Sequence, residues 1–212
     1  MVFAKKSLGQ NFLIDKNILE KIINTTNIEN KTILEVGPGT GNLTSYILKK
    51  NPKRLIVIEK DNELAKNLEI KFNNQIEILT DDVLKINENT LFKDKVTVFG
   101  NLPYNISTEI LSKWIINLKD QNFWFDSLIL MFQKEVANRI LARINTSAYG
   151  RLTVLANWKL EIKKICDVKP SAFFPKPKID SSILVFYPKN DFLNINDPKN
   201  LEKITRVFFL NL

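Results

Sequence analysis

The strongest constraint on the fold is an apolar strand that runs into a glycine-rich loop and then into a helix. Residues 32–36 have the composition of a buried strand, and the next five are Gly37-Pro38-Gly39-Thr40-Gly41. Residues 43–50 follow with the apolar spacing of a helix. Glycines let the backbone turn sharply and approach a ligand without an intervening Cβ. The unit predicts an α/β fold that binds a nucleotide-like molecule at this loop.

The alternation of strand and helix continues through most of the chain. Asp15 can cap a first helix whose apolar residues fall on one stripe. Further strands are predicted at 54–59, 76–79, 96–99 and 128–132, and helices at 62–72, 106–118 and 135–144. This order predicts a doubly wound, Rossmann-like sheet. The last two strand candidates, 161–166 and 182–187, have no helical pattern between them, so we expect antiparallel pairing and a reversed terminal strand.

Two regions are predicted from the pattern near the C-terminus. Residues 1–188 form one catalytic domain, and residues 189–212 form a linker and the start of a helical domain. Asp197 and Pro198 have the order of a helix cap and a first helical residue. An apolar stripe follows at helical spacing, and the chain stops at Leu212. This stripe looks like the beginning of a truncated helical domain.

Composition excludes several kinds of site. The chain has 212 residues, no histidine and one cysteine, Cys166. Ser-His-Asp triads, histidine general bases and clustered Cys or His metal sites are therefore excluded, and no metal is expected. The longest apolar runs are too short to span a bilayer, and the N-terminus lacks the apolar core of a secretory signal. We expect a cytoplasmic protein that does not enter a membrane.

The charge balance favours a polyanionic partner. Lys and Arg number 31 against 23 Asp and Glu, which gives a net charge of +8. An excess of positive charge is typical of proteins that bind nucleic acid. An A+T-rich genome also enriches lysine, so the charge alone does not decide between the two explanations.

Acidic residues follow the next two predicted strands. Glu59 ends the second strand, where a carboxylate can accept both hydroxyls of a ribose. Asp81 and Asp82 follow the third strand, and we favour Asp82 as the acceptor for the exocyclic amine of an adenine. The loop spacing Gly-x-Gly-x-Gly departs from the dinucleotide fingerprint and favours S-adenosylmethionine (AdoMet). A glycine turn that only packs, and a solvated acidic pair, are the structural alternatives.

The most specific motif is Gly100-Asn101-Leu102-Pro103-Tyr104, directly after the fourth strand. The side-chain carbonyl of Asn101 and the backbone carbonyl of Leu102, held extended by the following proline, can converge on an amino group. Two such acceptors orient an amine on a purine ring and favour a pyramidal nitrogen. Tyr104 offers a face on which a base can stack. A proline turn with a half-buried tyrosine is the structural alternative.

Taken in order, the motifs resemble those of the ribosomal RNA adenine dimethyltransferases. The resemblance lies in Glu59, Asp82 and the segments GQNFL at 9–13, EVGPGTG at 35–41, NLPY at 101–104 and FFPKPKIDS at 173–181. FQKEV at 132–136 and AYGRL at 148–152 are similar to the bacterial small-subunit branch. The resemblance covers about residues 5–188 of the chain.

The resemblance implies a class I methyltransferase fold and N6,N6-dimethylation of two adjacent adenosines in a hairpin loop near the 3′ end of 16S rRNA. The partner would be the 30S subunit or its precursor, and the enzyme a monomer. AdoMet would be bound by Asn11, Leu13, Gly37, Gly39, Glu59, Asp82 and Asn101. The catalytic residues would be Asn101, Leu102, Pro103 and Tyr104, together with Phe173, which would form the second aromatic plate around a flipped adenine.

Three alternatives remain at this point. The macrolide-resistance methyltransferases share every catalytic motif but act on 23S rRNA. A DNA adenine methyltransferase has a similar Asn-x-Pro-Tyr loop, although the segment 173–181 argues against it. A non-catalytic RNA-binding ribosome assembly factor is disfavoured because the glycines, the acidic residues and Asn101 are intact.

Overall fold

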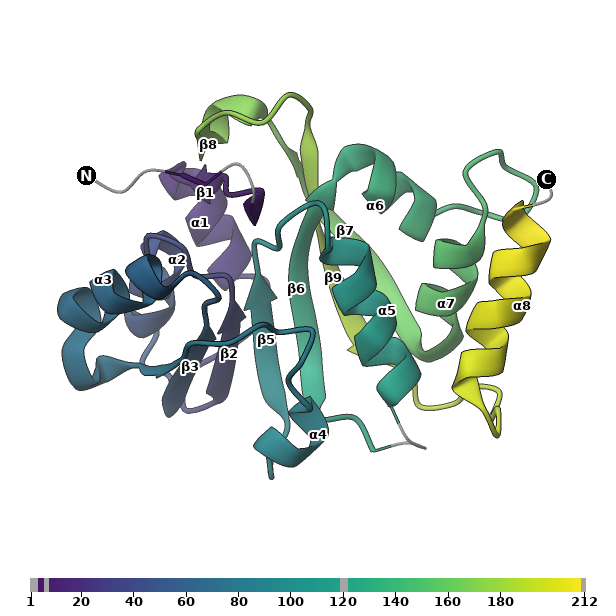
Figure 1. The fold of residues 1–212 in the computed structure, drawn as a ribbon, viewed down its shortest axis with the longest axis horizontal. Coiled ribbons are helices and arrows are strands. Elements are labelled where there is room, and N and C mark those ends of the chain that lie inside the picture. The colour runs from purple at the N-terminus through teal and green to yellow at the C-terminus, as the bar shows by residue number, and fades with distance from the viewer. Residues whose placement is uncertain (1–3, 6–7, 119–121, 211–212) are drawn as a thin grey trace.

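A seven-stranded sheet forms the centre of the computed structural model, which describes residues 4–5, 8–118 and 122–210 (Figure 1). The strand order is β4-β3-β2-β5-β6-β9-β7. The strands are β2 (Thr32–Val36), β3 (Arg54–Ile58), β4 (Glu77–Leu79), β5 (Val96–Gly100), β6 (Phe125–Gln133), β7 (Leu160–Val168) and β9 (Ser181–Pro188). The first five strands in this order are mutually parallel, as the doubly wound pattern predicts.

The antiparallel pairing predicted for the last two strands is confirmed. β9 is the reversed strand, since it runs against β6 on one side and β7 on the other. It lies one position inside the sheet, and β7 occupies the edge. The connection between β7 and β9 holds only a 3₁₀ turn, Pro170–Ala172, and the two-residue strand β8 (Phe173–Phe174). Such a connection is too short for a helical crossover, so parallel pairing is not available.

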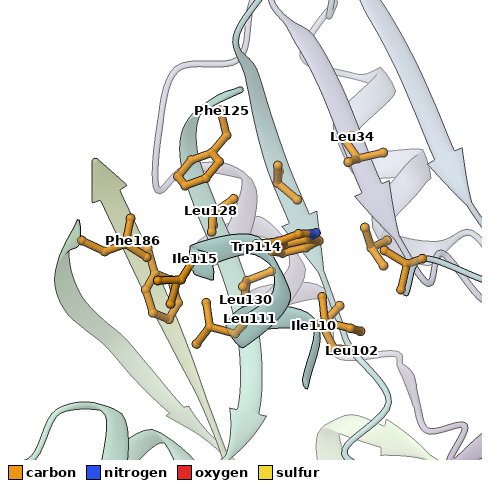
Figure 2. Close-up of a cluster of buried hydrophobic side chains, with 14 of the residues drawn as sticks. Leu34, Leu102, Ile110, Leu111, Trp114, Ile115, Phe125, Leu128, Leu130 and Phe186 are labelled. Atoms are coloured by element: carbon orange, nitrogen blue, oxygen red, sulfur yellow. The ribbon is translucent and has the colours of Figure 1, made fainter. Parts of the chain in front are cut away.

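Helices cover both faces of the sheet. One face carries α1 (Lys16–Ile23), α2 (Asn42–Leu48) and α3 (Asn62–Phe72), and the other carries α4 (Glu88–Leu91), α5 (Ser107–Asn117), α6 (Lys134–Ile140) and α7 (Arg151–Lys159). Successive strand residues point to opposite faces, so Ile33 belongs to the first core and Leu34 to the second. Figure 2 shows the second core around the fully buried Trp114 of α5. Burial on both faces explains why the central strands β2, β3, β5 and β6 consist mostly of apolar residues.

Local signals set several helix starts. The carboxylate of Asp15 accepts the backbone N–H groups of Asn17 at 2.9 Å and Ile18 at 3.2 Å, which confirms the predicted cap of α1. No apolar periodicity in the sequence predicts α7. This helix buries Thr153 and Lys159 beside its apolar residues, so its inner face does not show as an apolar stripe.

The predicted C-terminal helix forms as α8 (Pro198–Leu210), the yellow helix beside α7 in Figure 1. Arg151 of α7 pairs with Glu202 of α8 at 2.9 Å. Ile204, Val207 and Phe208 remain 60–65% exposed. A domain boundary after residue 188 stays a prediction. No helix among the described residues, α8 included, is long and apolar enough to cross a membrane.

Candidate cofactor and target site

Four neighbouring parallel strands place the predicted site residues at one edge of the sheet. β2 ends in the glycine loop, and β3, β4 and β5 are followed by Glu59, Asp82 and Asn101. Their carboxyl ends meet because β4, β3, β2 and β5 are adjacent and parallel. All of these residues, together with 8–13, line one cavity with about 1190 Å³ of empty space, including its open mouth. An open cavity lined by a few convergent polar groups is a candidate site for a small ligand.

The glycine loop has the conformation that its residues predict. Gly37 and Gly39 have φ values of +69° and +58°, in the left-handed region that a Cβ disfavours. A Cβ on Gly39 would also lie 2.8 Å from the ring of Phe12. The loop therefore brings bare backbone against the cavity and against the N-terminal segment.

Glu59 joins the glycine loop to the start of α3. Its Oε2 accepts the N–H of Gly39 at 3.1 Å, and its Oε1 accepts the N–H of Asp61 at 2.9 Å. Glu59 is 6% exposed, and burial raises the pKa of its carboxyl while these backbone N–H groups oppose the rise. Each oxygen keeps a further lone pair. The carboxylate can therefore accept two more donors, such as the hydroxyls of a ribose.

Asp82 lines the same cavity and is held from two sides. Its Oδ1 accepts the N–H of Leu84 at 3.0 Å, and its Oδ2 accepts the ammonium of Lys60 at 2.7 Å. The bond from Lys60 holds the pKa of Asp82 below its usual value. Asp81 also lines the cavity and is more exposed than Asp82. Within the described ranges, no group of three His, Cys, Asp or Glu side chains is placed to hold a metal ion.

Asn101 is oriented by the N-terminal segment. Its Nδ2 donates to the backbone carbonyl of Asn11 at 2.9 Å, which turns the side-chain oxygen to the other side. Leu102 is 1% exposed and its side chain packs in the core, so only its backbone carbonyl can contribute to a site. The two carbonyl groups that the sequence predicts as acceptors are thus presented by a fixed loop.

Tyr104 and Phe173, the two residues predicted to stack on the target adenine, lie in different environments. Tyr104 lines the cavity, and its hydroxyl lies 2.5 Å from the Oγ of Ser181. Phe173 does not line the cavity. Its side chain is 1% exposed, and on β8 it pairs with Leu13 of β1 (Phe12–Leu13) in the core.

Strand alternation explains the position of Phe173. Successive residues of a strand face opposite sides, so Phe174 faces away from the core and is 65% exposed. Phe174 pairs in register with Phe12, whose ring packs on Gly39. In this conformation Phe173 is a core residue, and a base has no access to its ring.

Sequence reasoning missed several residues that build the cavity. Asn42 donates through Nδ2 to the carbonyl of Leu13 at 2.8 Å and fixes the N-terminal segment. Glu35 lines the cavity and accepts the hydroxyl of Thr44 at 2.6 Å. Burial raises the pKa of Glu35 to about 7. Its signal in the sequence is a single acidic residue inside an otherwise apolar strand.

Comparison with known proteins decides the family. The family described as ribosomal RNA adenine dimethylase matches residues 1–211. The chain belongs to this family. One relative is "Ribosomal RNA small subunit methyltransferase A" of Pelagibacter ubique. It is 64% identical to this chain over 208 residues, which cover 98% of this chain and 79% of the relative. The protein of the same name from Wolbachia is 44% identical over 210 residues, covering 96% and 74%.

Solved structures agree with the family and the fold. A dimethyladenosine transferase from Plasmodium falciparum superposes on this chain with a TM-score of 0.79 at 32% identity. The match covers 94% of this chain and 70% of the transferase. The 23S rRNA methyltransferase ErmE gives a TM-score of 0.73 at 26% identity, covering 95% and 80%. The predicted class I methyltransferase fold is confirmed.

Proposed function

We propose that this dimethylase transfers methyl groups from AdoMet to N6 of two adjacent adenosines in a hairpin loop near the 3′ end of 16S rRNA. The observation that carries the proposal is the side chain of Asn101, which lines the same cavity as Tyr104 and whose amide N–H donates to the carbonyl of Asn11. The 64% identical relative is named for the small ribosomal subunit, and the structure named for 23S rRNA is 26% identical. The small-subunit target is therefore favoured over the macrolide-resistance alternative. We expect a cytoplasmic monomer acting on the 30S subunit or its precursor.

The cavity suits AdoMet, and each predicted contact has a chemical role. Glu59 accepts the ribose hydroxyls, and Asp82 accepts the exocyclic amine of the cofactor's adenine. Gly37 and Gly39 let the backbone lie against the cofactor. Leu13 is 4% exposed, so it contributes through its backbone.

Bound AdoMet supplies a methyl group on a positively charged sulfur, and the group passes to the amine nitrogen in one displacement. The Oδ1 of Asn101 and the carbonyl of Leu102 accept the two N6 hydrogens and direct the nitrogen lone pair toward the methyl group. This is catalysis by orientation, and it needs no covalent intermediate on the enzyme. In each transfer the bond between sulfur and the methyl carbon would break, S-adenosylhomocysteine would leave with the electron pair, and the methylated nitrogen would lose one proton to water. A monomethylated amine keeps one hydrogen, so the same residues can orient it for a second transfer.

The target adenine must leave its stack to reach Asn101. Tyr104 offers the accessible aromatic face, and the contact between its hydroxyl and Ser181 fixes the ring. Phe173 can serve as a second plate only if β8 rearranges, because its ring is buried. Tyr104 is therefore the stacking residue that the geometry supports.

Transfer of tritiated methyl groups tests the proposal. Wild-type protein and Asn101→Ala are assayed in parallel on 30S particles, free 16S rRNA, 23S rRNA and DNA. We expect label in small-subunit RNA, at two adjacent adenosines, and almost none with the variant. Preferential labelling of 23S rRNA would establish the macrolide-resistance alternative. Binding of 30S particles without any label would establish a non-catalytic assembly factor.

A further inference from the structure

Lys60 occupies an unusual position between the two acidic residues of the cofactor cavity. It follows Glu59 directly at the end of β3, and its ammonium reaches Asp82 beyond the end of the neighbouring strand β4. Lys60 and Asp82 both line the cavity. The ion pair therefore lies at the end of the cavity to which Asp82 belongs.

We propose that Lys60 is a positioning residue that holds Asp82 in the orientation that recognises the adenine of AdoMet. The inference rests on the proposed role of Asp82 as acceptor for the exocyclic amine. Lys60 and the N–H of Leu84 each engage one carboxylate oxygen, so together they fix the plane of the carboxylate. The lone pairs that remain accept the amine. The carboxylate of Asp82 carries a charge, so its bond to the amine is charge-assisted.

The neighbouring carboxylate of Asp81 explains why a positively charged partner stabilises the orientation of Asp82. Asp81 is adjacent, and its Oδ1 accepts the N–H of Asp82 at 2.6 Å. Two neighbouring carboxylates repel one another, and either could turn toward the cavity. The ammonium of Lys60 bonds Asp82, which offsets this repulsion and restricts the orientation of the Asp82 carboxylate.

The exposure of Lys60 indicates that its ion pair with Asp82 contributes little to folding stability. The side chain of Lys60 is 56% exposed and that of Asp82 is 14% exposed. Exposed ion pairs contribute little to folding stability. We therefore expect Lys60→Met to unfold in urea close to the wild type. Its effect should appear in ligand recognition instead.

Binding of two probes separates these roles. The first is S-adenosylhomocysteine, and the second is the analogue in which hydrogen replaces the exocyclic amine of the base. Calorimetry is performed on the full chain for wild type, Lys60→Met and Lys60→Arg. The matched control is Lys66→Met, which removes an exposed lysine of α3 that does not line the cofactor cavity.

We expect the wild type to bind the first probe more tightly than the analogue. In Lys60→Met the ratio of the two affinities should fall about tenfold, the scale of one charge-assisted hydrogen bond. Affinity for the analogue should hardly change. Lys60→Arg should restore most of the preference, and Lys66→Met should match the wild type.

Several results would overturn the proposal. An unchanged preference in Lys60→Met would overturn the role of Lys60 alone, with the Asp82 assignment intact. If Lys60→Met lowered the affinities for both probes equally, Lys60 would be a general contributor to the charge of the cavity. Loss of rRNA binding with both probe affinities intact would make it a phosphate contact. A wild type that binds both probes equally would overturn the Asp82 assignment itself, and the Lys60 proposal with it.

Discussion

Replacing Glu35 by Gln should change the pH dependence of folding by a predictable amount. Glu35 lies on β2, lines the cofactor cavity and is 2% exposed. Burial raises the pKa of its carboxyl from 4.5 to about 7, and the nearby charge of Glu59 adds to the rise. The hydroxyl of Thr44 donates to Glu35 and opposes it. Glutamine keeps an oxygen that can accept the same hydroxyl and has no charge to bury.

The sign and size follow from the two pKa values. Below pH 4.5 the carboxyl is neutral in both states and adds no pH-dependent term. Between pH 4.5 and about 7 the unfolded chain ionises while the folded protein stays neutral, so wild-type stability falls as the pH rises. One pKa unit corresponds to about 1.4 kcal/mol, so the full loss is about 3 kcal/mol above pH 7. Glu35→Gln lacks this loss.

The assay is urea unfolding of wild type and Glu35→Gln, without cofactor, at intervals from pH 4 to pH 8. The free-energy difference between the two proteins is the quantity to follow, because other titrating groups and any fixed cost of the amide cancel in its change with pH. We expect this difference to move by about 3 kcal/mol in favour of the variant across the range. A difference that stays constant with pH would refute the reasoning, since Glu35 would then titrate alike in both states.

Three further predictions concern the site. Glu59→Ala should weaken AdoMet binding by about 1.5–3 kcal/mol for each charge-assisted bond to the ribose, and calorimetry on folded protein checks this. Asn101→Ala should keep AdoMet affinity within a small factor while single-turnover methyl transfer falls sharply, because its oxygen acts on the target amine. Phe173→Ala should cost about 3–5 kcal/mol in urea unfolding as a core truncation, whereas Phe174→Ala should leave stability nearly unchanged. Normal stability of Phe173→Ala would contradict the core assignment.

The sheet could be predicted because its signals are local. β2, β3 and β5 are buried on both faces, so most of their residues are apolar, and this composition identifies them as buried strands. The residue after each strand then falls at the carboxyl edge by topology alone. The sequence therefore predicts Glu59, Asp82 and Asn101 at one edge of the sheet.

The choice between Phe173 and Phe174 could not be made from the sequence. A two-residue strand has no measurable period, and both residues are large and aromatic. Pairing with β1, some 160 residues earlier in the chain, decides which ring faces the core. Long-range register of this kind is set by tertiary packing and leaves no local signal.

The N-terminal segment links the proposed cofactor contacts to Asn101, the proposed catalytic residue. The carbonyl of Asn11 orients the Asn101 amide, and the side chain of Gln10 donates to Asp61 at 3.1 Å. The N–H of Asp61 in turn donates to Glu59, the proposed ribose acceptor. Residues 8–13 thus line the cavity and reach the proposed acceptors for both reactants, Asn101 through the backbone of Asn11 and Glu59 indirectly through the side chain of Gln10. Displacing these residues would remove the cavity wall and release the Asn101 amide at once, so neither site can be complete without the other.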